Sequence, residues 1–146
     1  MAAAPRTVDV VLYAEFDIDK GSTLRESVPC AIAHYSPEFF ADVMLPEGVH
    51  NRQQDHTIFF LNRERVVAPG DEKAREASDD PLQQFMYCLS VVRTHHDATV
   101  RRGARVKAVA LCSRLKFAFS FKGVLEVAVS KLALAKDETA TDEDPH

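Results

Sequence analysis

The N-terminal stretch "VDVVLYAEFDIDKGSTLRESV" holds the pattern that most limits how this chain can fold. Between positions 8 and 18 every second residue is apolar, and Tyr13, Glu15 and Asp17 lie between them. A period of two is typical of a strand that buries one face. Gly21 then stands where a tight turn needs a positive φ, and the alternation resumes after it. The sequence therefore predicts a β-hairpin over residues 7–28.

A helix is expected over residues 36–45, where Ser36 can act as N-cap and Pro37 suits the first helical position. Pro46 and Gly48 would end it. Three apolar stretches, 56–67, 82–93 and 104–113, are predicted to be strands. The first of them carries bulky residues on both faces, so we expect it inside the sheet.

From about residue 117 the apolar period becomes that of a helix. Its predicted apolar face comprises Phe121, Val124, Leu125, Ala128, Leu132 and Ala135. The order β-β-α-β-β-β-α with short connections predicts an α/β fold of the α+β kind. We expect a three-layer sandwich, with a five-stranded antiparallel sheet covered by a helix on each face. One domain would span residues 1–136, with a mobile polar insertion at 68–81 and a disordered acidic tail at 137–146.

Composition excludes several classes of protein. At 146 residues, with 46% hydrophobic and 27% charged residues, the chain can bury one core. A net charge of −4 gives no overall nucleic-acid signature, and no apolar run approaches the roughly 20 residues that cross a bilayer. The N-terminus lacks the pattern of a signal peptide. Cys30, Cys88 and Cys112 are widely spaced among apolar neighbours, so we expect buried, reduced thiols and a cytoplasmic location.

Motifs for catalysis or cofactor binding are weak throughout. "DIDKGST" has one glycine, preceded by its lysine, and does not fit a phosphate loop. Glu15, Asp17 and Asp19 share one strand face and could hold a cation. The rest of an EF-hand loop does not follow, so a solvated face, or one that meets basic partners, is favoured. The cysteines and histidines show no zinc spacing, and His95 and His96 are expected in a turn. We predict no catalytic residue, metal or cofactor.

One charge feature rises above background. The segment 93–122 contains eight basic residues and one acid, Asp97, which gives it a charge of +7. Such a patch steers an anionic partner if its members gather on one surface. The alternative is that they point to different sides of the fold and serve solubility. Nucleic acid is disfavoured as the partner, because no aromatic residues interleave with the basic ones over 93–107.

Three stretches carry a family resemblance: "VLYAEFDIDKGSTLR", "MLPEGVHNRQQDHTIFFLNR" and "VVRTHHDATVRRGARVKAVALCSR". Together they resemble the N-terminal Arf-docking module of fungal DENN-type proteins, the upstream DENN segment. The family pattern differs at His56, Lys116 and Gly123. The resemblance implies a longin fold and binding of an Arf- or Rab-type small GTPase in vesicle traffic and polarised growth. It also implies peripheral membrane association only through partners, and nucleotide exchange only together with further DENN segments.

Candidate partner-binding residues lie in two places. Asp17, Asp19 and Lys20 occupy the end of the first hairpin, and Arg101, Arg102 and Arg105 precede the last predicted strand. On this reading the chain is a GTPase-binding module that is not catalytic alone. The alternative is a longin-like adaptor or scaffold subunit, which pairs edge to edge with another longin sheet and does not contact a GTPase.

The arginine site gives a first prediction. Charge reversal of Arg101 and Arg102 together should weaken association with the GTPase, most strongly at low salt. The reason is that exposed charges are screened beyond roughly 8–10 Å at physiological ionic strength. Titration of the affinity across a salt series tests this, and equal affinities for variant and parent at every salt concentration would remove these arginines from the interface.

Overall fold

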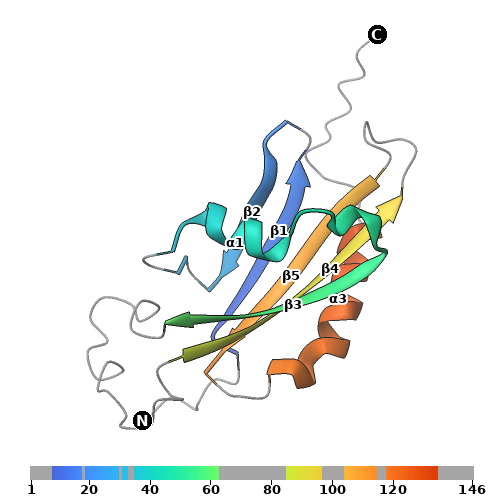
Figure 1. Ribbon diagram of the computed structural model, residues 1–146. Coiled ribbons are helices and arrows are strands. Elements are labelled where there is room, and N and C mark those ends of the chain that lie inside the picture. The colour runs from blue at the N-terminus through green and yellow to red at the C-terminus, as the bar shows by residue number, and fades with distance from the viewer. Residues whose placement is uncertain are drawn as a thin grey trace, which may run out of the picture.

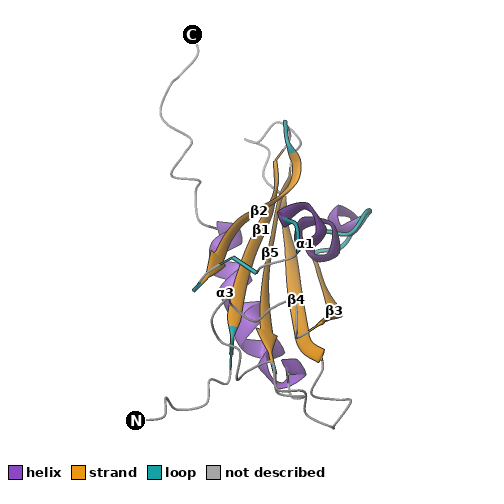
Figure 2. Ribbon diagram, turned by 90° about the vertical axis from the view of Figure 1, so that its left-hand side faces the viewer, coloured by secondary structure: helices purple, strands orange, loops and turns teal. Residues whose placement is uncertain are grey.

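The computed structural model describes residues 8–17, 19–29, 31–32, 35–62, 85–96, 104–114 and 118–134. In this part of the chain five strands form one sheet in the order β2-β1-β5-β4-β3, and every neighbouring pair is antiparallel. The strands are β1 (Val10–Asp17), β2 (Gly21–Val28), β3 (Gln54–Asn62), β4 (Phe85–His96) and β5 (Ala104–Ser113). Two α-helices, α1 (Pro37–Met44) and α3 (Lys122–Leu134), lie on opposite faces of the sheet (Figures 1 and 2). The predicted element order and the five-stranded antiparallel sheet are confirmed.

The hairpin of β1 and β2 forms where the alternation predicted it. Val10, Leu12 and Ala14 are buried on the face that α1 covers, and Phe16 packs against the same core. Gly21 has φ 77°, so the turn uses the backbone conformation that glycine provides. The strand begins later than the alternation predicts, because Val8 precedes β1 and packs with the core under α3 instead.

Local chemistry begins and ends α1 as expected. The Ser36 hydroxyl accepts a hydrogen bond from the Phe39 N–H at 3.1 Å, and Pro37 occupies the first turn. After α1, Gly48 has φ 80° and leads into the short 3-10 helix η1 (Val49–Asn51). The chain therefore turns sharply between α1 and β3.

Each face of the sheet carries its own core. Phe40 and Met44 of α1 pack on β1, β4 and β5 residues such as Leu12, while Leu125 and Val129 of α3 pack on the opposite face. The predicted apolar stripe of the last helix was partly wrong, because Val124 is exposed and Val129 is buried instead. A 3-10 turn, η4 (Ala118–Phe121), precedes α3 and delays its start relative to the prediction.

Two predictions about strands are wrong. The stretch that begins at Gln54 forms β3, which lies at an edge of the sheet and not inside it. His95 and His96 are the last residues of β4, because they pair with Arg105 and Ala104 of β5, and so are not in a turn. The insertion 68–81 and the tail 137–146 lie outside the described residues. Among the helices described, none is long and apolar enough to cross a membrane.

The hairpin turn yields a stability prediction. Gly21→Val should lower the free energy of unfolding by about 1–2 kcal/mol, because a β-branched side chain is strained at this φ. Gly123→Ala is the matched control: it lies in α3 with nothing within 4 Å of an added Cβ. It should raise stability by a few tenths to about 1 kcal/mol. Denaturant titration measures both, and a Gly21→Val curve identical to the parent's would contradict the assigned turn.

The two described thiols give a second prediction. Cys88 and Cys112 lie directly opposite each other on β4 and β5 and are fully buried. Burial raises the pKa of the Cys88 thiol, and its contact with Cys112 raises it further. In a Cys30→Ser background neither thiol should react with a disulfide reagent at pH 8 until the protein unfolds, because both side chains are fully buried and out of the reagent's reach. Rapid labelling of the folded protein would contradict this.

Candidate functional site

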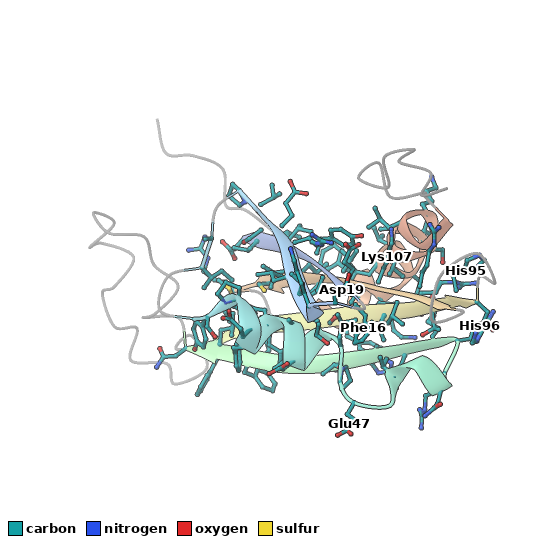
Figure 3. All side chains as sticks on the ribbon, turned by 90° about the horizontal axis from the view of Figure 1, so that it is seen from above. Phe16, Asp19, Glu47, His95, His96 and Lys107 are labelled. Carbon is teal, nitrogen blue, oxygen red and sulfur yellow. The ribbon has the colours of Figure 1, made fainter. Side chains whose placement is uncertain are left out.

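A groove of about 760 Å³ opens at one end of the sheet on the face that carries α1. It lies where β1 ends and β2 begins, beside the corner after α1, the end of β4 and the start of β5. Figure 3 shows the molecule from above, with Glu47 on the α1 side, Lys107 on the α3 side and Phe16 between them. The lining residues are Phe16, Ser22, Asp42, Leu45, Pro46, Glu47, Gly48, Val49, His96 and Val106.

The groove has an apolar interior and a charged rim. Phe16, Leu45 and Val106 belong to the core under α1 or pack against it, so their positions are set by the fold. Asp42 and Glu47 are exposed on the α1 side, and His96 is exposed at the end of β4. An apolar interior with a few polar groups around it is the usual character of a binding site.

Backbone hydrogen bonds hold the corner after α1 in place. The Leu45 N–H donates to the Ala41 carbonyl at 2.9 Å, and the Val49 N–H donates to the Pro46 carbonyl at 3.1 Å. The Thr94 hydroxyl of β4 donates to the Val49 carbonyl at 3.4 Å and so links the corner to the sheet. This wall of the groove is therefore preformed, and little order has to be gained on binding.

On the α3 face of the same end, Glu15 is the centre of a polar cluster. Its carboxylate accepts hydrogen bonds from Arg25 Nε at 2.5 Å and Tyr13 Oη at 2.9 Å. Lys107 is directly opposite Glu15 in the β1–β5 register and is also buried. Of the two expectations for the acidic row, the meeting with basic partners is confirmed for Glu15. The ion pair between Arg25 and Glu15 therefore links β2 to β1 close to the hairpin turn.

The described residues of the basic segment are divided between two ends of the molecule. On the α3 face of the groove end, Arg93 pairs in register with Lys107, and His95 with Arg105. Arg93 Nη1 also donates to Gln54 Oε1 at 3.2 Å. Elsewhere, Arg114 pairs with Asp9 at 3.1 Å and Lys122 with Glu126 at 2.8 Å. Only part of the +7 segment therefore gathers on one surface.

The predicted site residues have different placements. Asp19 and Lys20 are exposed in the hairpin turn, and Asp17 is the last residue of β1, paired with Gly21. Arg105 is half-buried at the same end but on the α3 face, so it does not line the groove. Arg101 and Arg102 lie outside the described residues. The described members of the predicted site thus reach one end of the sheet, but Arg105 does not share a surface with the groove.

The sequence prediction missed Asp42, Glu47 and His96, which stand on the groove rim. The sequence "LPEG" does indicate a corner of the chain near Glu47. It does not indicate which other elements of the fold lie beside that corner. Among the residues described, no three His, Cys, Asp or Glu side chains come together to hold a metal ion. The groove is therefore suited to bind a partner that presents an apolar group with charged groups beside it.

Comparison with known proteins gives two matches. Residues 10–81 match the family described as "Docking domain of Afi1 for Arf3 in vesicle trafficking". The chain is also similar to the AFI1-like protein C776.06c of Schizosaccharomyces pombe (strain 972 / ATCC 24843), with 29% identity over 127 residues. That alignment covers 83% of this chain and 20% of the relative, so the chain spans about a fifth of the relative's length. No solved structure matches.

The family match and the groove involve the same segment. Among the described residues that line the groove, all except His96 and Val106 lie within 10–81. The stretch that is similar to a docking domain therefore forms most of the groove wall.

Proposed function

We propose that this chain is a docking module for an Arf-type small GTPase, and that the groove with its rim is the contact surface. The observation that carries the proposal is that the segment similar to an Arf3-docking domain forms most of the groove wall. The similarity to an AFI1-like protein over 83% of the chain supports the same function.

The groove offers an apolar contact with charged groups around it. An apolar side chain of the GTPase would be buried against Phe16 and Leu45, and basic groups beside it would face Asp42 and Glu47. Complementary charges around an apolar contact fix the orientation of the partner and speed association. Asp19 and Lys20, exposed in the hairpin turn, would extend the contact along the groove's edge.

The finer proposal is that the module is the upstream, longin-like part of a DENN-type exchange factor for an Arf or Rab protein. The element order β-β-α-β-β-β-α, with a helix on each face, supports a longin-like fold. Exchange would then require further segments of a longer protein, and this chain alone would bind without catalysing. It would act in the cytoplasm in vesicle traffic and polarised growth, reaching membranes only through its partner.

Charge reversal at the rim tests the contact surface. Asp42→Lys combined with Glu47→Lys should weaken binding of an Arf-type GTPase by about tenfold or more, because like charges would then face each other. Both residues are exposed, so the fold should keep its stability within about 0.5 kcal/mol. Isothermal titration with the GDP- and GTP-loaded GTPase measures the change in Kd.

Glu26→Lys is the matched control. Glu26 is an exposed acid of β2 that lies outside the groove. Its reversal changes the net charge in the same sense and should leave the affinity unchanged. Equal affinities for the parent and the rim variant would exclude the groove, and absence of binding by the parent in either nucleotide state would overturn the proposed function.

A second candidate function is the adaptor or scaffold subunit that pairs with another longin sheet. One observation favours it: β3 is an edge strand with exposed apolar side chains. Capture of an Arf protein in one nucleotide state supports the docking module, whereas capture of a longin protein alone supports the adaptor.

A further inference from the structure

The two edges of the sheet differ in how well they are protected against pairing with another strand. β2 at one edge carries a register shift opposite Tyr13 and Ala14 and two adjacent charges, Arg25 and Glu26. β3 at the other edge runs for nine residues in unbroken register with β4. It contains no Lys, Arg, Pro or Gly, although such residues and bulges are what usually keep edges apart.

The side of β3 that faces the α3 layer is apolar and uncovered. Ile58 is 50% exposed and Phe60 56% exposed, while α3 packs mainly on β4 and β5. Phe85, which pairs with Asn62, is also exposed, as is Phe119, whose ring meets His56 at 5.8 Å. We call these four residues the β3 patch: Ile58, Phe60, Phe85 and Phe119. Large exposed apolar groups gathered beside an open edge indicate an interface.

Backbone geometry shows which groups of β3 point outward. The Thr94 N–H donates to the Gln53 carbonyl, so in this antiparallel ladder the odd-numbered residues of the strand bond to β4. The even-numbered residues therefore direct their N–H and C=O groups away from the sheet. Two of the outward N–H groups are already capped, that of His56 by Asp55 Oδ1 at 2.8 Å and that of Asn62 by Tyr35 Oη at 2.9 Å.

Between these two caps lie Ile58 and Phe60, the two exposed large apolar residues of β3. Within the described chain no hydrogen-bond partner meets their outward groups. A strand that pairs with β3 here must contact the apolar side chains of Ile58 and Phe60. It must also bond to their outward N–H and C=O groups, which are two residues apart.

We propose that a second copy of this chain pairs with β3 in antiparallel fashion, with the two-fold axis at Phe59. In this register Ile58 lies opposite Phe60 of the second copy, and the reverse pair forms by symmetry. The two residues of each pair exchange both N–H···O bonds. These bonds use the outward backbone groups of Ile58 and Phe60, and the hydrogen bonds that cap the His56 and Asn62 N–H groups stay in place. The apolar side chains of both copies then lie on the same face of a continuous sheet.

A second copy suits this edge in charge and in size. Asp55 is the one carboxylate of β3; it lies outside the paired stretch and forms an ion pair with Arg52 at 3.5 Å, so no like charges oppose each other. The three half-exposed phenylalanine rings offer about 100 Å² each and Ile58 adds a smaller area, so the β3 patch supplies no more than about 400 Å² per copy. That is below the roughly 800 Å² per partner of a stable complex, so the dimer is weak and reversible.

Ile58→Lys tests the interface against a closely matched variant. Ile58 and Val28 are both β-branched, both 50% exposed and both on edge strands, so Val28→Lys is the control. Over a series from about 1 μM to 1 mM protein, light scattering should show the parent and Val28→Lys approaching twice the chain mass of 16.3 kDa. Ile58→Lys should stay near 16.3 kDa. Thermal melts of both variants confirm that they are folded.

Amide exchange by NMR gives a position-specific readout. The N–H groups of Ile58 and Phe60 should become protected as the concentration rises, while those of β2 should not change. A parent protein that is monomeric throughout the series overturns the proposal, as does a dimer that survives Ile58→Lys. A loss of GTPase binding in Ile58→Lys without a change in mass would assign the β3 patch to the GTPase and would also overturn it. The groove is not involved, so the rim variant should dimerise normally.

Discussion

The architecture depends on a central ladder, β4 with β5, that is buried on both faces. Leu89 and Val91 face α3 while Cys88 and Val92 face the α1 side, so helices are needed on opposite sides of the sheet. Because α3 packs mainly on β4 and β5, it leaves the α3-side face of β3 without a helix. The exposure of Ile58 and Phe60 on that face follows from how the two helices divide the sheet.

The same arrangement brings the groove together. Antiparallel strands place the hairpin turn, the end of β4 and the start of β5 at one end of the sheet. The corner after α1 then closes over this end, because Gly48 turns the chain and Thr94 holds the Val49 carbonyl. A site assembled from a turn, a helix corner and two strand ends is rigid in its floor and accessible at its rim. That combination suits docking of a folded partner more than enclosure of a small substrate.

Patterns within single elements predicted much of this fold. The alternation around Leu12 and the Ser36 cap each gave the correct element, because both signals are local. The groove rim was not predicted, since Glu47 and His96 line the same groove only when the corner after α1 is folded against the end of β4. The basic segment shows the same limit: its charge is evident from composition, yet Arg114 faces Asp9 at the other end of the molecule from Arg105. Which charges share a surface is decided by strand register, and composition contains no information on it.

The mistaken placement of β3 has a physical cause that bears on its role. Bulk on both faces predicts a strand inside the sheet, since burial on both faces selects for such residues. Phe59 and Leu61 do face the core, but Ile58 and Phe60 face outward beside an open edge. A strand whose open edge pairs with another molecule is expected to carry the same kinds of side chain as a strand with two neighbours in its own chain. The sequence of β3 is therefore that of an interior strand, and dimerisation through its edge would make it one.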